Sequence, residues 1–173
     1  MTMAKQLKRR KVVETLLAER GDLLVIGGLG APAWDITAAG DHANNFPMWG
    51  AMGGAAVLGL GLALAQPKRQ VLVVTGDGEM LMGIGSLATI GISKAPNLSI
   101  VVLDNEAYGE TGQQDTATKH GVSRDRIHEK RGSLFAQIKI DPEKMPLVLP
   151  PRDSTYIKNR MRISILGEAA LHD

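Results

Sequence analysis

The sequence contains no cysteine, which excludes disulfide bonds and zinc sites built on thiolate ligands. It has only two residues each of tryptophan, tyrosine and phenylalanine, so small side chains must fill much of the core. A formal charge of +2 is too small to indicate a nucleic-acid partner, and the basic residues do not alternate with aromatic side chains as stacking platforms do. We therefore expect no nucleic-acid binding.

The N-terminal residues also lack the charged and then apolar pattern of a secretory leader, so a cytoplasmic protein is expected. Residues 43–67 carry no charge, and Gly50 and Gly54 stand four apart, as in packed membrane helices. The polar Asn44 and Asn45 at the start of this segment, and the basic pair that follows it, indicate a buried helix of a soluble protein instead. We expect no membrane span, and we expect this helix to lie at an interface.

Apolar runs of strand length alternate along the chain with stretches of helical length. This alternation predicts an α/β fold with a doubly wound, mostly parallel sheet flanked by helices. Strands are expected at 23–26, 71–75, 98–103 and 134–140, and helices at 5–20, 50–65, 80–93 and 157–166. Prolines after residue 140 predict an irregular C-terminal arm over about 141–173, and we expect residues 1–173 to form a single domain.

Basic residues cluster near the N-terminus, where apolar residues recur between them at helical spacing. This pattern predicts an amphipathic first helix with a solvated basic face. The basic residues are Lys5, Lys8, Arg9, Arg10 and Lys11.

Gly28 and Gly30 open a glycine-rich loop directly after the first expected strand. With Ala33 they fit the G-x-G-x-x-A pattern of dinucleotide-binding proteins, which is a weak signal in a chain with 20 glycines. A nicotinamide site also needs an acidic residue about 20 positions later, and residues 48–54 supply none. The loop is interpreted as a tight strand-to-helix turn with room for another phosphate.

The most informative motif is a pair of polar clusters that follow two expected strands. Gly76-Asp77-Gly78 ends the first, and Asn105 follows the second, 28 residues after Asp77. Parallel strands separated by a crossover helix end at the same edge of a sheet, so these clusters should lie close together. A carboxylate and an amide oxygen suit Mg²⁺ or Ca²⁺, and a helix start suits a phosphate. The motif predicts a divalent metal that carries a diphosphate.

These clusters resemble the cofactor-diphosphate (PP) domain of thiamine diphosphate-dependent enzymes, whose fingerprint is Gly-Asp-Gly followed nearly thirty residues later by a paired asparagine. The similarity is closest to the β subunits of sulfopyruvate and phosphonopyruvate decarboxylases. It extends over residues 45–53, 76–82, 104–112 and 149–153. The resemblance implies the thiamine diphosphate-binding fold.

The resemblance also implies a set of ligand contacts. Asp77, the side-chain oxygen of Asn105 and the backbone carbonyl of Ala107 would hold Mg²⁺, which bridges the two phosphates. Backbone N–H groups at the start of the helix after residue 76 would meet the diphosphate, and the loop at residues 28–30 would close from the other side. The implied cofactor contacts are Gly28, Leu29, Gly30, Gly50, Met52, Gly76, Gly78, Glu79, Met80 and Tyr108.

Three residues are candidates for the chemistry itself. The resemblance implies that the backbone carbonyl of Gly50 accepts the 4'-amino group of the cofactor and that Met52 is the apolar wedge that bends the cofactor. His42 lies just before this segment and is a candidate proton donor to substrate, although an isolated histidine is more commonly a surface or capping residue.

The resemblance further implies a missing partner. In this superfamily, the glutamate that activates the aminopyrimidine ring comes from a pyrimidine-binding (PYR) domain, for which the chain has no room. We therefore expect a separate PYR-domain (α) subunit and an α₂β₂ or larger assembly. Residues 115–131 are also shorter than the corresponding stretch of family members, so a peripheral sheet element could be absent.

The implied activity is cleavage or formation of a carbon–carbon bond beside a carbonyl, foremost decarboxylation of a 2-oxo acid. Lyase or carboligase chemistry on 2-hydroxy ketones is the nearest alternative. A non-catalytic regulatory module that binds a phosphate ligand is a further alternative.

Overall fold

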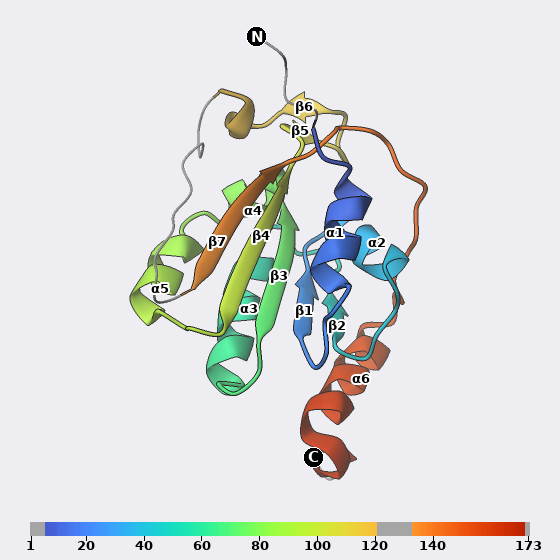
Figure 1. Cartoon of the computed structure of the whole chain (residues 1–173), viewed down its shortest axis with the longest axis vertical. Coiled ribbons are helices and arrows are strands. Elements are labelled where there is room, and N and C mark those ends of the chain that lie inside the picture. The colour runs from blue at the N-terminus through green and yellow to red at the C-terminus, as the bar shows by residue number, and fades with distance from the viewer. Residues whose placement is uncertain (1–5, 121–132, 172–173) are drawn as a thin grey trace.

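The computed structural model describes residues 6–120 and 133–171, and its centre is a five-stranded parallel sheet (Figure 1). The order of the strands across the sheet is β2-β1-β3-β4-β7, and every neighbouring pair is parallel. The α/β fold that the sequence predicts is therefore confirmed. The strands are β1 (Leu24–Gly27), β2 (Asn45–Pro47), β3 (Val71–Gly76), β4 (Leu98–Asp104) and β7 (Leu134–Lys139).

Helices cover both faces of this sheet. Alternate residues of the strands point to opposite faces, so Val73 packs under one helical layer while Leu72 and Val74 pack under the other. Burial on both faces explains why β3 reads as a continuous apolar run. One layer holds α1 (Arg9–Leu17) and α2 (Ala31–Ala38), and the other holds α3 (Ala55–Ala65) and α5 (Ser86–Ser93).

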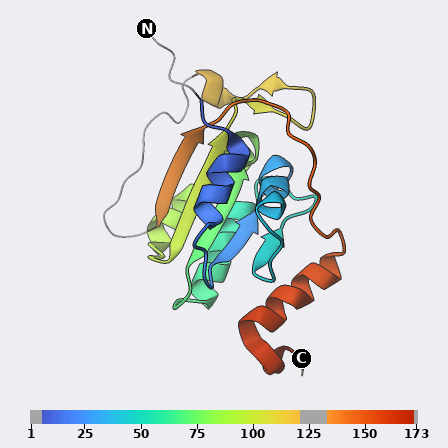
Figure 2. The same cartoon turned by 45° about the vertical axis from the view of Figure 1, so that its right-hand side comes forward.

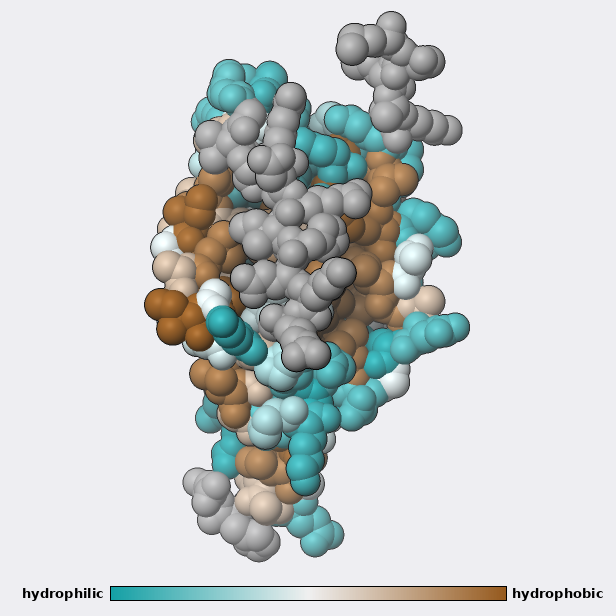
Figure 3. Space-filling model, turned by 60° about the vertical axis from the view of Figure 1, so that its left-hand side comes forward, coloured by the Kyte–Doolittle hydropathy of each residue, from teal (hydrophilic) through white to brown (hydrophobic). Residues whose placement is uncertain are grey.

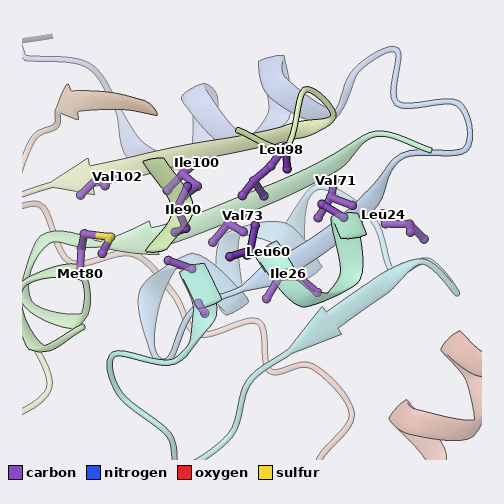
Figure 4. Close-up of a cluster of buried hydrophobic side chains, with 14 of the residues drawn as sticks. Leu24, Ile26, Leu60, Val71, Val73, Met80, Ile90, Leu98, Ile100 and Val102 are labelled. Carbon is purple, nitrogen blue, oxygen red and sulfur yellow. The ribbon is translucent and has the colours of Figure 1, made fainter. Parts of the chain in front are cut away.

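The core under α3 and α5 is built from aliphatic side chains, as the low aromatic content requires (Figure 4). Leu60 of α3 and Ile90 of α5 meet residues of β1, β3 and β4 there. Gly59 lets α3 approach the sheet closely, because a Cβ at this position would overlap the side chain of Val73. Small residues in α3 thus set the distance between helix and sheet.

The expected helix at 80–93 is two helices, which corrects the prediction. The structure has α4 (Asp77–Met82) and α5, separated by Gly83 and Gly85. Gly83 lies directly on the backbone of Gly53, so the chain leaves the helical path where two backbone segments touch.

The sequence-based element order also missed α2 and β2, which lie between the loop at residues 28–30 and α3. Both are short, and β2 has only three residues. The expected helix at 50–65 begins later, at Ala55, because Gly50 and Gly53 have φ values of +72° and +86° and form a loop. The first helix is likewise shorter than the expected 5–20.

The N-terminal basic cluster is not a wholly solvated face. Arg9 and Arg10 both form ion pairs with Asp35 of α2, a residue that is 0% exposed. Lys11 remains exposed, as the prediction has it. The two arginines therefore join α1 to α2 and correct the interpretation of the cluster.

A small hairpin and a C-terminal arm complete the structure. The hairpin pairs β5 (Ala107–Tyr108) with β6 (Gln114–Asp115) and is followed by the 3₁₀ helix η1 (Ala117–His120). The arm runs from the end of β7 to α6 (Ser154–Leu166), which packs against β2 and ends in η2 (Gly167–Leu171) (Figure 2). Within the described residues, none of the helices has both the length and the apolar character needed to cross a membrane.

Two contacts fix the arm where α6 begins. The carboxylate of Asp153 accepts hydrogen bonds from the backbone N–H groups of Thr155 and Tyr156 and so caps α6. Trp49 donates its indole N–H to the carbonyl of Pro151 at 2.9 Å. The arm is thereby tied to the loop before α3.

Candidate functional site

The carboxyl ends of the parallel strands lie together at the top of Figure 1. Residues at and after these strand ends line a cavity of about 710 Å³. From β1 the chain continues to β2 on one side of it, and from β3 it continues to β4 on the other side. The direction of the connections therefore reverses between β1 and β3. Open α/β sheets bind ligands at such a point. The lining comes mainly from residues 29–34, 76–82, 103–114 and 140–147, with Arg9 and Met52.

Asp77 is the first residue of α4 and lines this cavity although it is only 2% exposed. Its Oδ2 accepts hydrogen bonds from the hydroxyls of Thr116 at 2.5 Å and Thr118 at 3.3 Å. Burial raises the pKa of the Asp77 carboxyl and the nearby Asp104 raises it further, whereas the bond from Thr116 lowers it. No cationic side chain of the described residues forms an ion pair with Asp77, so a bound cation would stabilise its charged form.

Asn105 follows β4 and lines the same cavity. Its side-chain Oδ1 accepts a hydrogen bond from the backbone N–H of Ala107 at 3.2 Å, which holds residues 105–107 in a tight turn. Because Gly76 is paired with Leu103 in the sheet, Asp77 and Asn105 follow adjacent strand ends. The structure thus brings together the three residues that the sequence nominates as metal ligands.

Two threonines at this site are missed by the sequence analysis. Thr116 and Thr118 are 0% and 3% exposed, although the residues on either side of them are exposed. The two threonines are separated by one residue, a spacing that would place them on the same side of an extended segment. The sequence offers no other sign that they are buried. They connect the loop after β4 to the carboxylate of Asp77.

Glu79 contributes its side chain to the site rather than its backbone alone. One carboxylate oxygen accepts a hydrogen bond from the backbone N–H of Ala55 in the first turn of α3 at 3.2 Å, and the other accepts from the hydroxyl of Thr75. Gly28 lies against the same carboxylate, because a Cβ there would overlap it. Glu79 is 3% exposed, and burial raises the pKa of its carboxyl. It therefore joins three backbone segments beneath the cavity.

Glycines allow other groups to lie close to the backbone around the cavity. A Cβ at Gly78 would lie 2.6 Å from the ring of Tyr108, so this ring packs against Gly78. Gly30 has a φ of +81°, and the side chain of Glu110 occupies the space above it. Leu29 also lines the cavity.

The loop before α3 places Met52 at the cavity, where it is 39% exposed. Gly50 is exposed in the same loop but does not line the cavity in this chain alone. Met80, predicted as a cofactor contact, points its side chain into the core and is 7% exposed, which leaves only its backbone for such a role.

The structure does not bring His42 to the site. It precedes β2 and therefore lies at the edge of the sheet opposite the strand ends that form the cavity. Its Nδ1 accepts the backbone N–H of Asn44 at 3.0 Å, and burial lowers the pKa of its imidazole. His42 thus binds a nearby backbone N–H group, as an isolated surface or capping histidine commonly does.

Comparison with known proteins identifies the fold. Residues 28–145 match the family described as "Thiamine pyrophosphate enzyme, C-terminal TPP binding domain", a span that includes both polar clusters and all of the cavity lining except Arg9 and Leu147. The chain belongs to this family. Membership supports thiamine diphosphate as the cofactor.

Relatives include the sulfopyruvate decarboxylase subunit beta of Methanocaldococcus jannaschii, which is 37% identical over 121 residues, or 69% of this chain and 64% of the relative. The same subunit of Methanothermobacter thermautotrophicus is 43% identical over 110 residues, or 64% of this chain and 59% of the relative. A phosphonopyruvate decarboxylase of Streptomyces viridochromogenes is 45% identical over 109 residues, or 62% of this chain and 27% of the relative. The match thus spans about 60% of the curated beta subunits and about a quarter of the longer decarboxylase.

The chemistry of the donor set fits a hard cation. A carboxylate and an amide oxygen, both at one cavity, are the ligand types that Mg²⁺ takes in proteins, usually with phosphate oxygens and water completing the octahedron. The first turn of α4 offers backbone N–H groups at the same place, which suits a phosphate. The residues present therefore fit a metal-bound diphosphate.

Proposed function

We propose that the chain is the cofactor-diphosphate subunit of a thiamine diphosphate- and Mg²⁺-dependent enzyme that decarboxylates a 2-oxo acid. The observation that carries this proposal is the placement of Asp77 and Asn105 at adjacent strand ends on one cavity, inside the segment that matches the family. Substrates related to sulfopyruvate or phosphonopyruvate are favoured, because relatives carry those names. We infer that residues 1–173 form one such domain with an arm at 141–173, and a cytoplasmic location stays a prediction.

Different residues would contact the metal, the diphosphate and the ring system of the cofactor. Asp77, Asn105 and the carbonyl of Ala107 would hold Mg²⁺, and the start of α4 would bind the diphosphate through backbone N–H groups. When bound, thiamine diphosphate supplies the electron sink that lets a carbon–carbon bond beside a carbonyl break. The chain's own residues orient that group: Met52 at the cavity rim would support the ring system, and the carbonyl of Gly50 would accept its amino group.

Calorimetric titration of thiamine diphosphate, with Mg²⁺ and with EDTA, tests the cofactor. We expect binding that requires Mg²⁺ and is strengthened by a co-purified partner. A panel of 2-oxo acids and 2-hydroxy ketones assayed with the complex then separates a decarboxylase from a carboligase. Tight binding of a nucleotide with no binding of thiamine diphosphate would instead indicate a regulatory module, and decarboxylation by the chain alone would contradict the need for a partner.

An apolar surface next to the cavity supports the proposal of a partner. Val57 and Leu64 on the outer side of α3 are 47% and 58% exposed, and Ile92 of α5 is 83% exposed. Met52 and Met82, which line the cavity, are 39% and 57% exposed, so apolar side chains are also exposed at the cavity rim. Figure 3, in which the left-hand side of Figure 1 with α5 comes forward, shows apolar patches among polar residues on this side of the molecule. Exposed apolar surface of this kind marks interaction sites. We infer that a PYR-domain subunit with the activating glutamate docks here, in an α₂β₂ or larger complex.

Leu64→Glu tests this docking surface. A carboxylate buried without a partner costs several kcal/mol, so we expect association with the partner to weaken at least about tenfold, measured by analytical ultracentrifugation or biolayer interferometry. The exposed position predicts little change in the melting temperature of the isolated chain. Leu171→Glu is the control, since Leu171 is 70% exposed on η2, outside α3. Equal association of both variants with the partner would contradict the assignment.

A substitution at Glu110 is expected to strengthen cofactor binding. Its carboxylate lies against Gly30, in the loop proposed to close on the diphosphate, where negative charge opposes a negative ligand. Glu110→Gln keeps the size and removes the charge, so we expect the affinity for thiamine diphosphate to rise up to about fivefold, a modest gain because the residue is exposed. Calorimetry at low and high salt measures it, and the gain should shrink as salt screens the charge. Weaker binding by the variant would show that the carboxylate supports the loop instead.

A further inference from the structure

The loop after β4 is fastened to the sheet at both of its ends. At its start, the backbone N–H of Glu106 donates to Asp104 Oδ1 at 3.0 Å. At its end, Thr118 Oγ1 donates to the same oxygen at 2.8 Å, and the backbone N–H of Thr116 donates to the carbonyl of Glu106 at 3.0 Å. Asn105 lies at the start of this loop. Both of the proposed side-chain ligands are therefore connected to one closed segment, residues 104–118.

The protons of the two threonine hydroxyls are fully used. Each hydroxyl has one proton to donate. Thr116 Oγ1 lies 2.5 Å from Asp77 Oδ2, whereas Thr118 Oγ1 lies closer to Asp104 at 2.8 Å than to Asp77 at 3.3 Å. The shortest distances assign the proton of Thr116 to Asp77 and that of Thr118 to Asp104. The two hydroxyl oxygens are 2.8 Å apart, and with both protons assigned to carboxylates neither hydroxyl donates to the other. The backbone of residues 116–118 therefore connects the two carboxylates.

Asp104 and Asp77 differ in whether a cationic side chain lies next to them. Asp104 is 0% exposed and has a counter-ion in Lys139, whose Nζ lies 2.7 Å from Asp104 Oδ2 and 2.6 Å from Glu106 Oε1. Gln137 also donates to Asp104. Asp77 has only hydroxyl and backbone donors among the described residues. Negative charge that remains uncompensated therefore lies on Asp77, at the cavity.

We propose that Thr116 and Thr118 are positioning residues for Asp77, and that they fix the direction in which its carboxylate meets a divalent cation. The bond from Thr116 goes to Oδ2 and restricts rotation of the carboxylate without occupying Oδ1. Thr118 donates to Asp104 and so holds the end of the loop that carries Thr116 against the sheet. The loop that carries Asn105 at its start thus orients Asp77 from its end. This inference rests on the proposed function, because it concerns the same metal site.

Thr116→Val tests it in the complex of the chain with its partner. Valine keeps the shape and removes the hydroxyl. The readouts are the apparent dissociation constant for Mg²⁺ at saturating thiamine diphosphate, followed by tryptophan fluorescence since Trp34 lines the cavity, and the electron paramagnetic resonance spectrum of bound Mn²⁺. Loss of an outer partner of a ligand lowers metal affinity by about 10- to 100-fold. We expect a loss in that range for Thr116→Val, a smaller loss for Thr118→Val, and recovery in Thr116→Ser, which restores the donor.

Thr37→Val is the matched control, because its hydroxyl donates to the carbonyl of Ala33 within α2 and does not approach the site. Thermal melts of all variants without ligand separate folding from metal binding. An unchanged Mg²⁺ affinity in Thr116→Val, with or without a lower melting temperature, would overturn the positioning role while leaving the cofactor assignment intact. A wild-type complex that takes up thiamine diphosphate equally well in EDTA would overturn both.

Discussion

Asp77→Asn is expected to abolish Mg²⁺-dependent binding of thiamine diphosphate. The amide keeps the size of the side chain and removes the negative charge that remains uncompensated at the cavity. Because loss of an outer partner alone costs up to about 100-fold in metal affinity, loss of the charged ligand should cost at least that much. Calorimetry in saturating and in limiting Mg²⁺ measures the effect, and quenching of the cavity-lining Trp34 offers a second reading.

The control for this variant is Asp115→Asn. Asp115 lies on β6 beside Thr116, forms an exposed ion pair with Lys119, and does not line the cavity. It changes the net charge equally, so a long-range electrostatic effect would appear in both variants. Retention of wild-type Mg²⁺-dependent uptake by Asp77→Asn would remove the basis of the proposed function.

Gly83→Ala is expected to give the largest loss of stability. A Cβ at Gly83 would overlap the backbone carbonyl of Gly53, and neither backbone segment can rotate away as a side chain would. We expect the free energy of unfolding to fall by about 3 kcal/mol, at the upper end of the cost of overpacking. Urea unfolding followed by circular dichroism measures the change as a lower midpoint.

Gly91→Ala should have the opposite sign. Gly91 is exposed within α5, and no atom lies within 4 Å of the position that a Cβ would take. Alanine there should raise the free energy of unfolding by about 0.5–1 kcal/mol, because it restricts the unfolded chain and suits a helix. Equal effects of the two substitutions would show that the contact between Gly53 and Gly83 is loose.

The sequence predicts the central strands and the placement of the two proposed metal ligands, because both depend on short-range signals. The run before Gly76 is apolar on both faces, and strand ends in a parallel sheet must meet, so Asp77 and Asn105 follow from local pattern and topology together. The split between α4 and α5 could not be predicted, because it depends on contact with Gly53, 30 positions away. β2 has too few residues for a periodic signal.

The polar interior of the site was also beyond sequence reasoning, for a physical reason. Thr116 and Thr118 are surrounded by exposed residues in the chain, and only the return of the loop onto β3 and β4 buries them. Arg9 and Arg10 look like a solvated face until Asp35 of α2 is placed against them. In each case the interacting residue belongs to another element. The periodicity of apolar residues along the sequence does not reveal such contacts.

The carboxylate of Glu79 also links positions that would otherwise vary independently. It fills the space in which a side chain at position 28 would lie, and it holds the start of α3. A side chain at position 28 would therefore displace the carboxylate of Glu79 from its hydrogen bonds with Ala55 and Thr75. Positions 28 and 79 should therefore covary among homologous proteins. Residues larger than glycine at position 28 should occur only where position 79 carries a short side chain.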